Sequence, residues 1–321
     1  MTLATLDLSL FTRGDQTQSE AFCKSFIEAL KSQGFVKLIN HDADEFFDLS
    51  EECKLKCEHP QRPNPHRGWS KLGKEKLAGI TGFQKNVTNP PQVNDLKETF
   101  DQGNAKDDMF DNIWPDEQDI PGFRTFMEAF FEQCHLMHMQ LLAATETGLA
   151  LRTGRLVSLC NRNETELRLT RYPRVDIDRL RDGKTTRIAE HTDFGTFTLL
   201  FQDSTGGLEV EDQRRLGTFL PVTAEKEGKM EMIVNVGDTV QRWTNDELCS
   251  VNHRVTLPTA LKDVKCGSSV VPARTSVAFF GKANRHASLR CFPEFSQHKA
   301  ARFDEDVTAH EYNQRMVEKT Y

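Results

Sequence analysis

The chain has 321 residues, of which 37% are hydrophobic and 28% are charged, and 48 acidic against 41 basic side chains give a formal net charge of −7. This composition is typical of a globular protein, and the acidic balance argues against nucleic acid as a partner. The longest apolar runs, such as 277–280, are far shorter than the roughly 18 residues that span a bilayer, so no membrane association is expected.

The N-terminal sequence and the cysteines indicate the compartment. The first residues, MTLATLDLSLFTRGD, lack a basic start and carry Asp7 inside their apolar stretch, so a signal peptide is not expected. The chain has 8 cysteines and no Cys-x-x-Cys pair, which indicates reduced thiols and not a disulfide framework. We therefore expect a cytoplasmic protein that works as a monomer or a weak homo-oligomer.

The first part of the chain is predicted to be helical around one strand. Apolar residues at helical spacing predict a helix over 19–33. The run FVKLIN then predicts a buried strand, followed by a charged helix that ends near Lys56. Three prolines and a glycine make residues 60–68 a loop.

A long scaffold helix is predicted over 121–151, and after it the sequence pattern changes from helical to β-rich. Apolar side chains at three- and four-residue spacings form one stripe along this helix. Beyond it, short runs of β-forming residues alternate with turn signals, which is typical of a jelly roll or barrel. The predicted strands lie near 166–172, 185–190, 196–202, 207–211, 231–236, 238–243, 251–256 and 274–281.

No Ser/Gly-rich linker separates the helical part from the β-rich part, so we expect one compact unit over 1–321. Within it we distinguish an N-terminal mixed helix and strand region, the long scaffold helix, a jelly-roll core and a C-terminal lid or helix. Their bounds are 1–120, 121–151, 165–284 and 285–321.

Two histidines and one aspartate in the β-rich part suggest a metal site. His191 and Asp193 are two residues apart at the end of a predicted strand and can face one ion, and His253 is expected on a strand across the barrel. Two imidazoles and a carboxylate on one face of a metal leave positions open, as non-haem iron(II) oxygenases require. In the alternative interpretation, Asp193 caps a turn and both histidines are ordinary core or surface residues.

A second pair of residues predicts a carboxylate site. Arg274 and Ser276 alternate on one face at the start of an apolar strand, and a guanidinium beside a hydroxyl is a good ligand for a carboxylate. The alternative is an edge-strand arginine paired with a nearby acidic residue.

Taken together, these residues resemble the iron(II)- and 2-oxoglutarate-dependent dioxygenases of the isopenicillin N synthase-like family, closest to the fungal branch of thymine hydroxylases and secondary-metabolite oxygenases. The resemblance implies a mixed α and β fold, with a double-stranded β-helix (jelly-roll, cupin-like) core, flanking N-terminal helices and a C-terminal helical lid. The matching segments are LINH, RGW, LKETFDQGN, LRLTRYP, EHTDFGTFTLLFQDSTGGLEV, VNVGDTVQRWTND, VNHRV and ARTSVAFF.

The resemblance also implies the cofactors and their ligands. Iron(II) would be held by His191, Asp193 and His253, and 2-oxoglutarate by Arg274 and Ser276 with Tyr172 as a third contact. With O2, such an enzyme oxidises a small organic molecule by hydroxylation, desaturation or ring rearrangement such as ring expansion, and converts 2-oxoglutarate to succinate and CO2.

Substrate residues follow from the positions that form the pocket mouth in this family. Arg168 alternates with Thr170 and Tyr172, so it can face the barrel interior and meet an acidic or carbonyl-bearing substrate, or form a rim salt bridge instead. Phe194 and Phe280 would give an apolar wall or plain core. The implied set is His66, Arg67, Trp69, Arg168, Phe194 and Phe280.

Departures from the family pattern touch this mouth and not the iron. The usual RGY turn is RGW, and GKANRHASLRC replaces the usual Asn-Pro after the Arg-x-Ser strand. The preferred substrate is a carbonyl- or phenol-bearing ring compound of fungal secondary metabolism, with a thymine-like nucleobase as the runner-up. Two alternatives are an iron oxidase that does not use 2-oxoglutarate and a non-catalytic binding protein on the same fold.

Overall fold

The computed structural model describes most of the chain. The described residues are 5–7, 15, 17–18, 21, 25, 37–39, 43–60, 66–75, 94–181, 185–222, 232–264 and 270–318. The helix predicted over 19–33 lies almost entirely outside them. The strand predicted at FVKLIN is confirmed as β2 (Lys37–Ile39), which pairs in parallel with β1 (Thr5–Asp7).

The single charged helix predicted before Lys56 is two short helices, α3 (Ala43–Asp48) and α4 (Glu51–Leu55). The break falls at Ser50, whose hydroxyl accepts a hydrogen bond from the backbone N–H of Cys53 and so caps α4. A serine that caps one helix cannot also continue the helix before it, which explains why the prediction of one helix was wrong.

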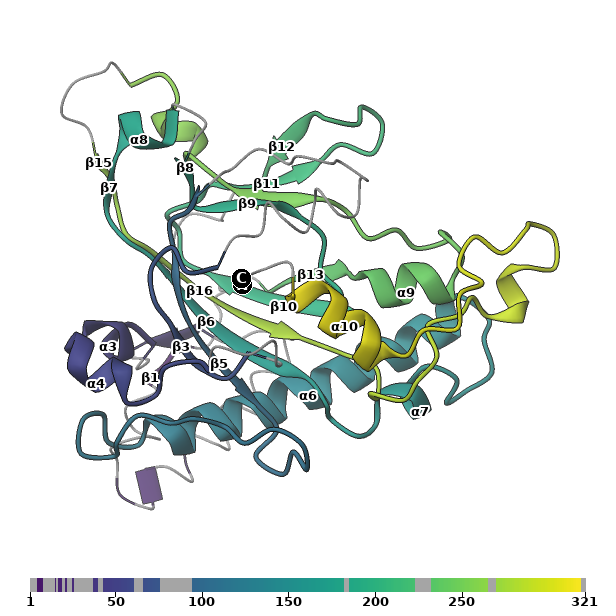
Figure 1. The fold of residues 1–321 in the computed structure, drawn as a ribbon, viewed down its shortest axis with the longest axis horizontal. Coiled ribbons are helices and arrows are strands. Elements are labelled where there is room, and N and C mark those ends of the chain that lie inside the picture. The colour runs from purple at the N-terminus through teal and green to yellow at the C-terminus, as the bar shows by residue number, and fades with distance from the viewer. Residues whose placement is uncertain are drawn as a thin grey trace.

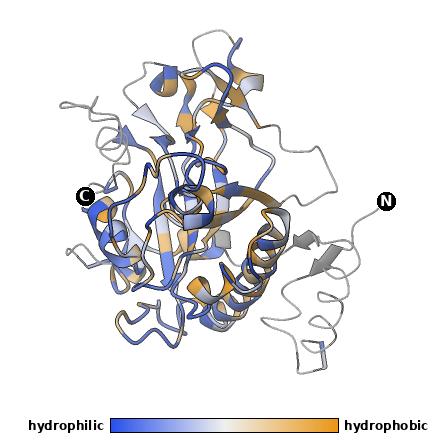
Figure 2. Ribbon diagram, turned by 90° about the vertical axis from the view of Figure 1, so that its right-hand side faces the viewer, coloured by the Kyte–Doolittle hydropathy of each residue, from blue (hydrophilic) through white to orange (hydrophobic). Residues whose placement is uncertain are grey.

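Helix α6 (Phe123–Gly148) confirms the long scaffold helix. Its buried positions recur at the predicted three- and four-residue spacing, which gives one face to the core. In Figure 1 the helix runs along the outside of the large sheet, and Figure 2 shows hydrophobic and hydrophilic residues together on it. Phe123 and Phe131 of this helix share one core with Leu167 and Phe279 of the sheet, so α6 covers the sheet's outer face.

The large sheet has six antiparallel strands, in the order β13-β10-β16-β6-β5-β3. Two central strands, β16 and β6, pair along their whole lengths, so that Arg274 lies opposite Tyr172 and Phe280 opposite Glu166. The strands are β13 (Met232–Val236), β10 (Phe197–Gln202), β16 (Arg274–Phe280), β6 (Glu166–Tyr172), β5 (Glu98–Gly103) and β3 (Gly68–Ser70).

A second, four-stranded antiparallel sheet has the order β12-β11-β14-β9. Two further sheets have two strands each: β15 pairs with β7, and β4 pairs with β8. The remaining strands are β12 (Phe219–Pro221), β11 (Leu208–Glu211), β14 (His253–Val255), β9 (Ile188–His191), β15 (Val270–Val271), β7 (Val175–Asp176), β4 (Asn94–Asp95) and β8 (Thr185–Thr186). The protein therefore has a mixed α and β fold with two main sheets.

Residues 238–243, predicted as a strand, form helix α9 (Asp238–Trp243). Val240 and Trp243 are both 0% exposed, and their spacing of three places them on one helical face. Gly237 precedes the helix at a close approach, because a Cβ there would lie 2.3 Å from the carbonyl oxygen of Gly195. The prediction failed because Thr239 and Val240 are good strand formers, while helical packing decides the structure.

The strand predicted over 185–190 is also divided, because β8 pairs with β4 whereas β9 pairs with β14. Arg187 occupies the break between the two strands. The other predicted strands are found within two residues of their expected bounds.

The C-terminal region ends in helix α10 (Ala309–Val317). A capping box formed by Thr308 and Glu311 stabilises the start of this helix. The hydroxyl of Tyr312 donates a 2.8 Å hydrogen bond to Asp238, which joins α10 to α9. Met316 of α10, the yellow helix in Figure 1, packs with Ala189 of β9. The other short helices are α7 (Val157–Cys160), α8 (Ile177–Arg181), η1 (Thr259–Leu261) and η2 (Pro293–Phe295). Within the described residues, no helix has both the length and the apolar character needed to cross a membrane.

Candidate metal centre and cavity

Strand register brings the three predicted metal ligands together. His253 of β14 lies directly opposite His191 of β9, so the two histidines come from neighbouring strands and not from strands across a barrel as predicted. Asp193 follows two residues after His191, and its Oδ1 lies 3.9 Å from Nε2 of His191 and 3.7 Å from Nε2 of His253. One donor atom from each residue lies within 4.8 Å of the others, and this is the only such group of His, Cys, Asp or Glu found among the described residues.

Hydrogen bonds to the far side of each ligand fix which atom faces the centre. Nδ1 of His191 donates to the carbonyl of Ala189 at 2.8 Å, and Nδ1 of His253 donates to the carbonyl of Val251 at 3.2 Å, which leaves both Nε2 atoms free. Oδ2 of Asp193 accepts hydrogen bonds of 2.6 Å from Thr198 and from Asn235, so Oδ1 remains free. Such outer partners orient metal ligands and raise their affinity.

The protonation states also suit a metal. Burial and the proximity of His253 lower the pKa of His191 to about 3, against an opposing effect of Asp193, so its imidazole is neutral near pH 7. Burial alone would raise the pKa of Asp193, but both histidines and the hydrogen bonds from Thr198 and Asn235 lower it. Two imidazole nitrogens and one carboxylate oxygen fit a divalent transition metal such as iron(II), because these ligands form one face and leave other positions open.

The predicted carboxylate ligands also lie together. The pairing of β16 with β6 puts Arg274 opposite Tyr172, and the guanidinium carbon of Arg274 lies 4.8 Å from the Tyr172 ring centroid. Arg274 donates to Ser276 at 3.3 Å and to Gln202 at 2.7 Å, while its Nε has no partner among the described residues. Arg274 is 1% exposed, and no described carboxylate pairs with it. A buried guanidinium with spare donors and no counter-ion is a site for a carboxylate.

Both groups open into one cavity of about 160 Å³ between the two sheets. Alternate residues of β6 and β16 face it, from Tyr172 and Arg274 at one end to Glu166 and Phe280 at the other. The predicted common face of Arg168, Thr170 and Tyr172 is therefore confirmed. Ile188, Leu200, Leu208, Val210 and Ile233 give the cavity apolar walls between its polar ends.

The end that contains Arg168 is charged. Arg168 donates to Asp101 at 2.6 Å and to Glu75 at 2.8 Å, and Glu75 also pairs with Lys97. Burial and the charge of Arg168 lower the pKa of His66, which faces Glu75 at 3.2 Å, to about 3. Lys97, Arg168 and His66 line the cavity, while the two carboxylates that neutralise the cations lie behind them. The lining of this end therefore includes two cations, Lys97 and Arg168, whose carboxylate partners Glu75 and Asp101 do not line the cavity.

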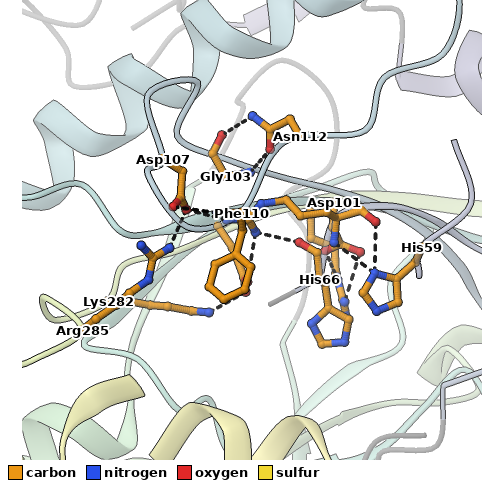
Figure 3. A network of polar contacts seen from close by, with 12 residues as sticks. His59, His66, Asp101, Gly103, Asp107, Phe110, Asn112, Lys282 and Arg285 are labelled. Atoms are coloured by element: carbon orange, nitrogen blue, oxygen red, sulfur yellow. Dashed lines mark hydrogen bonds and ion pairs between the residues drawn. The ribbon is translucent and has the colours of Figure 1, made fainter. Parts of the chain in front are cut away.

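Lys282 and Glu166 add a second charged pair to this end. Nζ of Lys282 donates to Glu166 at 2.5 Å, and both residues line the main cavity and a small one beside it. Glu166 also accepts a bond from Arg67 at 3.3 Å. Figure 3 shows this polar network continuing to Asp107, which Arg285 approaches from the Lys282 side.

Four of the six predicted substrate residues line the main cavity, and two do not. His66, Arg168, Phe194 and Phe280 line the main cavity. Arg67 does not line the main cavity, because its guanidinium is bound by Asp107 and Glu166, and it lines the small neighbouring cavity instead. Trp69 is 2% exposed, belongs to the aromatic core and donates to Glu98 at 2.9 Å. It does not line either cavity, and its ring lies under Lys54 of α4, whose Nζ is 5.2 Å from the ring centroid.

Several site residues were missed by sequence reasoning. Lys282 continues the alternation of cavity-facing residues at 274, 276, 278 and 280, and Glu166 precedes Arg168 by two residues on the cavity face of β6. Both residues could therefore have been predicted from the two-residue period of a strand. Thr198 and Asn235 lie opposite each other on β10 and β13. No local signal marked them, since their role depends on the pairing of strands far apart in the sequence.

Comparisons with known proteins agree with this site. A family model described as the 2OG-Fe(II) oxygenase superfamily matches residues 160–283, and one for the N-terminal part of a non-haem dioxygenase in morphine synthesis matches 3–117. The 2-oxoglutarate-dependent dioxygenase gloF of Glarea lozoyensis is 45% identical and the proline hydroxylase buaE of Petromyces alliaceus 44%, each over 100% of both chains. The crystal structure of a full-length Neurospora crassa protein with alpha-KG and thymine has 29% identity and a TM-score of 0.72, covering 99% of this chain and 97% of that chain.

The hydroxyl of Thr198 is predicted to strengthen metal binding. Thr198→Val should weaken the binding of a divalent metal by roughly 10- to 100-fold, because Asp193 loses one of the two bonds that orient it. Calorimetric titration of the metal-free protein with Co(II) measures the effect. Thr196→Val is the matched control, since that buried hydroxyl contacts His138 and not Asp193. Equal affinities of wild type and Thr198→Val would contradict the prediction.

Glu166 is predicted to make folding sensitive to acid. Burial would raise its pKa, but Lys282, Arg67 and His66 lower it to about 2 from an ordinary value of 4.5. The charged form therefore stabilises the fold above pH 4.5, and this contribution of about 3 kcal/mol is lost as the pH falls towards 2. Denaturant unfolding of the wild type should lose that much more stability over this interval than Glu166→Gln does. Parallel pH profiles of the two proteins would refute the assignment.

Proposed function

The chain belongs to the 2OG-Fe(II) oxygenase superfamily, and from this premise we propose that His191, Asp193 and His253 hold its iron(II). The enzyme is a 2-oxoglutarate-dependent dioxygenase, whose reaction uses iron(II), 2-oxoglutarate and O2 and yields succinate and CO2. The observation that supports the metal assignment best is the orientation of the three ligands, each with one atom bonded away from the centre and the other left free.

We assign the distal carboxylate of 2-oxoglutarate to Arg274, Ser276 and Tyr172. These residues are buried at one end of the cavity that also contains the three metal ligands, and the guanidinium there has no carboxylate partner among the described residues. A dianion that spans the space from this end to the metal would satisfy both sites. The bound metal supplies the O2 chemistry, while the protein orients the cosubstrate and excludes water.

The finer architecture belongs to the same proposal. The two sheets would form the double-stranded β-helix (jelly-roll) core. We also propose that the chain is divided into the four regions predicted from the sequence. Asn313 and Val317 of α10 line the cavity, and Tyr312 joins that helix to α9. This supports a C-terminal helical lid within 285–321, because removal of α10 would uncover the charged end of the cavity.

We propose that the substrate is a small zwitterion of the amino-acid type. Lys97, Arg168 and Lys282 give the cavity a cationic wall for a carboxylate, and Glu166 lies beside them for an ammonium group. A relative of 44% identity over the whole chain is named a proline hydroxylase. This charged wall suits an amino acid better than the neutral ring compound favoured by the sequence. The fungal origin of the relatives agrees with the expected role in fungal secondary metabolism.

Succinate formation tests the cofactor assignment. Asp193→Ala should abolish iron binding and turnover, and Arg274→Ala should raise the KM for 2-oxoglutarate by about 10- to 100-fold, because a bond to a charged group contributes about 1.5–3 kcal/mol. Succinate is measured by mass spectrometry with a matched control, Arg171→Ala, whose side chain contacts Asp48 instead of the cavity. Normal turnover in Asp193→Ala would rule out the metal centre.

Substrate charge is tested with L-proline, L-prolinamide and thymine as probes. We expect substrate-dependent succinate formation with the amino acid and a loss with its amide, which lacks the carboxylate. Lys282→Met should lower kcat/KM for the amino acid by at least about tenfold, since it removes one cation from the wall. Turnover with thymine and none with L-proline or other free amino acids would contradict the zwitterion proposal while leaving the oxygenase assignment intact.

A further inference from the structure

Arg187, in the break between β8 and β9, is a buried cation that forms no ion pair with a described carboxylate. Its side chain is 0% exposed, and only one guanidinium nitrogen, Nη2, has a partner, the backbone carbonyl of Pro272. Nε and Nη1 have no hydrogen-bond partner. Asp203 attracts Arg187 only as a charge beyond ion-pair distance, and its two oxygens accept bonds from the backbone N–H groups of Thr205 and Thr275. A buried charge without hydrogen-bond partners destabilises the fold, so an arginine at this position indicates that a ligand supplies a negative charge nearby.

The position of Arg187 identifies where that charge belongs. Its guanidinium carbon lies 5.8 Å from the ring centroid of Tyr172, and that of Arg274 lies 4.8 Å from the same centroid. Burial and the repulsion from Arg274 lower the pKa of Arg187 to about 10, which leaves it charged at neutral pH. Two like charges are thus buried around one tyrosine, and neither has a carboxylate of the described chain as its partner.

We propose that Arg187 is a positioning residue for 2-oxoglutarate, a second buried cation that attracts its distal carboxylate through Tyr172. This inference rests on the proposed function, in which Arg274, Ser276 and Tyr172 contact that carboxylate. Arg187 does not line the cavity. The positive charge of Arg187 attracts the carboxylate at a distance, and its guanidinium lies against the Tyr172 ring. Arg274 makes the direct contact with the carboxylate. The single negative charge of the distal carboxylate then offsets part of the repulsion between the two arginines.

The test compares two oxo acids that differ only at the distal end. 2-Oxoglutarate carries the second carboxylate, and 2-oxopentanoate has the same chain length without it. Binding to the Mn(II)-loaded protein is measured by calorimetry, so no turnover is required. Arg187→Leu should weaken the binding of 2-oxoglutarate about tenfold and leave the binding of 2-oxopentanoate unchanged. Arg187→Lys, which keeps the charge, should retain most of the preference.

Matched variants separate the possible outcomes. Arg171→Leu removes one positive charge from the opposite face of β6 and should change neither affinity. Arg187→Gln provides a second neutral variant if Arg187→Leu does not fold. Equal weakening of both acids would mean a structural role, and an unchanged preference for 2-oxoglutarate would mean no role, so either result overturns the inference. Arg274→Leu is measured in parallel, because an unchanged preference in that variant would overturn the carboxylate site itself and not only the role of Arg187.

Discussion

The carboxylate of Asp193 is the point at which the two sheets meet, and the rest of the site depends on how it is held. One oxygen accepts bonds from Thr198 and Asn235 of the six-stranded sheet, and the other faces His191 and His253 of the four-stranded sheet. A buried carboxylate needs partners on both sides, so it fixes the distance between the sheets while it keeps one oxygen free. The cavity exists in the space that this arrangement holds open.

The second constraint is the separation of charge along β6 and β16. Their pairing places Arg274 opposite Tyr172 at one end and Phe280 opposite Glu166 at the other, where Lys282 donates to Glu166. The small side chains of Thr170, Ser276 and Ala278 lie between the first end and Arg168. An elongated dianion is favoured where cations lack partners, and a zwitterion is favoured where cations and a carboxylate alternate. The metal ligands lie on the opposite sheet, so a ligand at either end can approach the same centre. In the proposed function, this strand pair therefore separates the cosubstrate from the substrate.

Features that depend on local periodicity could be predicted from the sequence. Strand β6 has the predicted bounds, and alternation correctly put Arg274 with Ser276 and Arg168 with Tyr172. Features that depend on partners distant in the sequence could not. The β-forming residues of 238–243 predict a strand, but Val240 and Trp243 pack with helical spacing and the segment is a helix. The positions of Trp69 and Arg67 likewise depend on core packing and on carboxylates distant in the sequence. The assignment of Arg187 required knowing which polar atoms burial leaves unpaired.

The central claim is that one cavity binds iron(II) through His191, Asp193 and His253 and chelates a keto acid anchored at Arg274. An anaerobic titration of the metal-free protein with iron(II) and then 2-oxoglutarate tests it most directly, because keto-acid chelation of iron(II) produces a weak visible charge-transfer band. The account predicts that the band appears with the wild type, is absent in Asp193→Ala, and requires far more 2-oxoglutarate in Arg274→Ala. Iron binding without any band, or a band that persists unchanged in both variants, would contradict it.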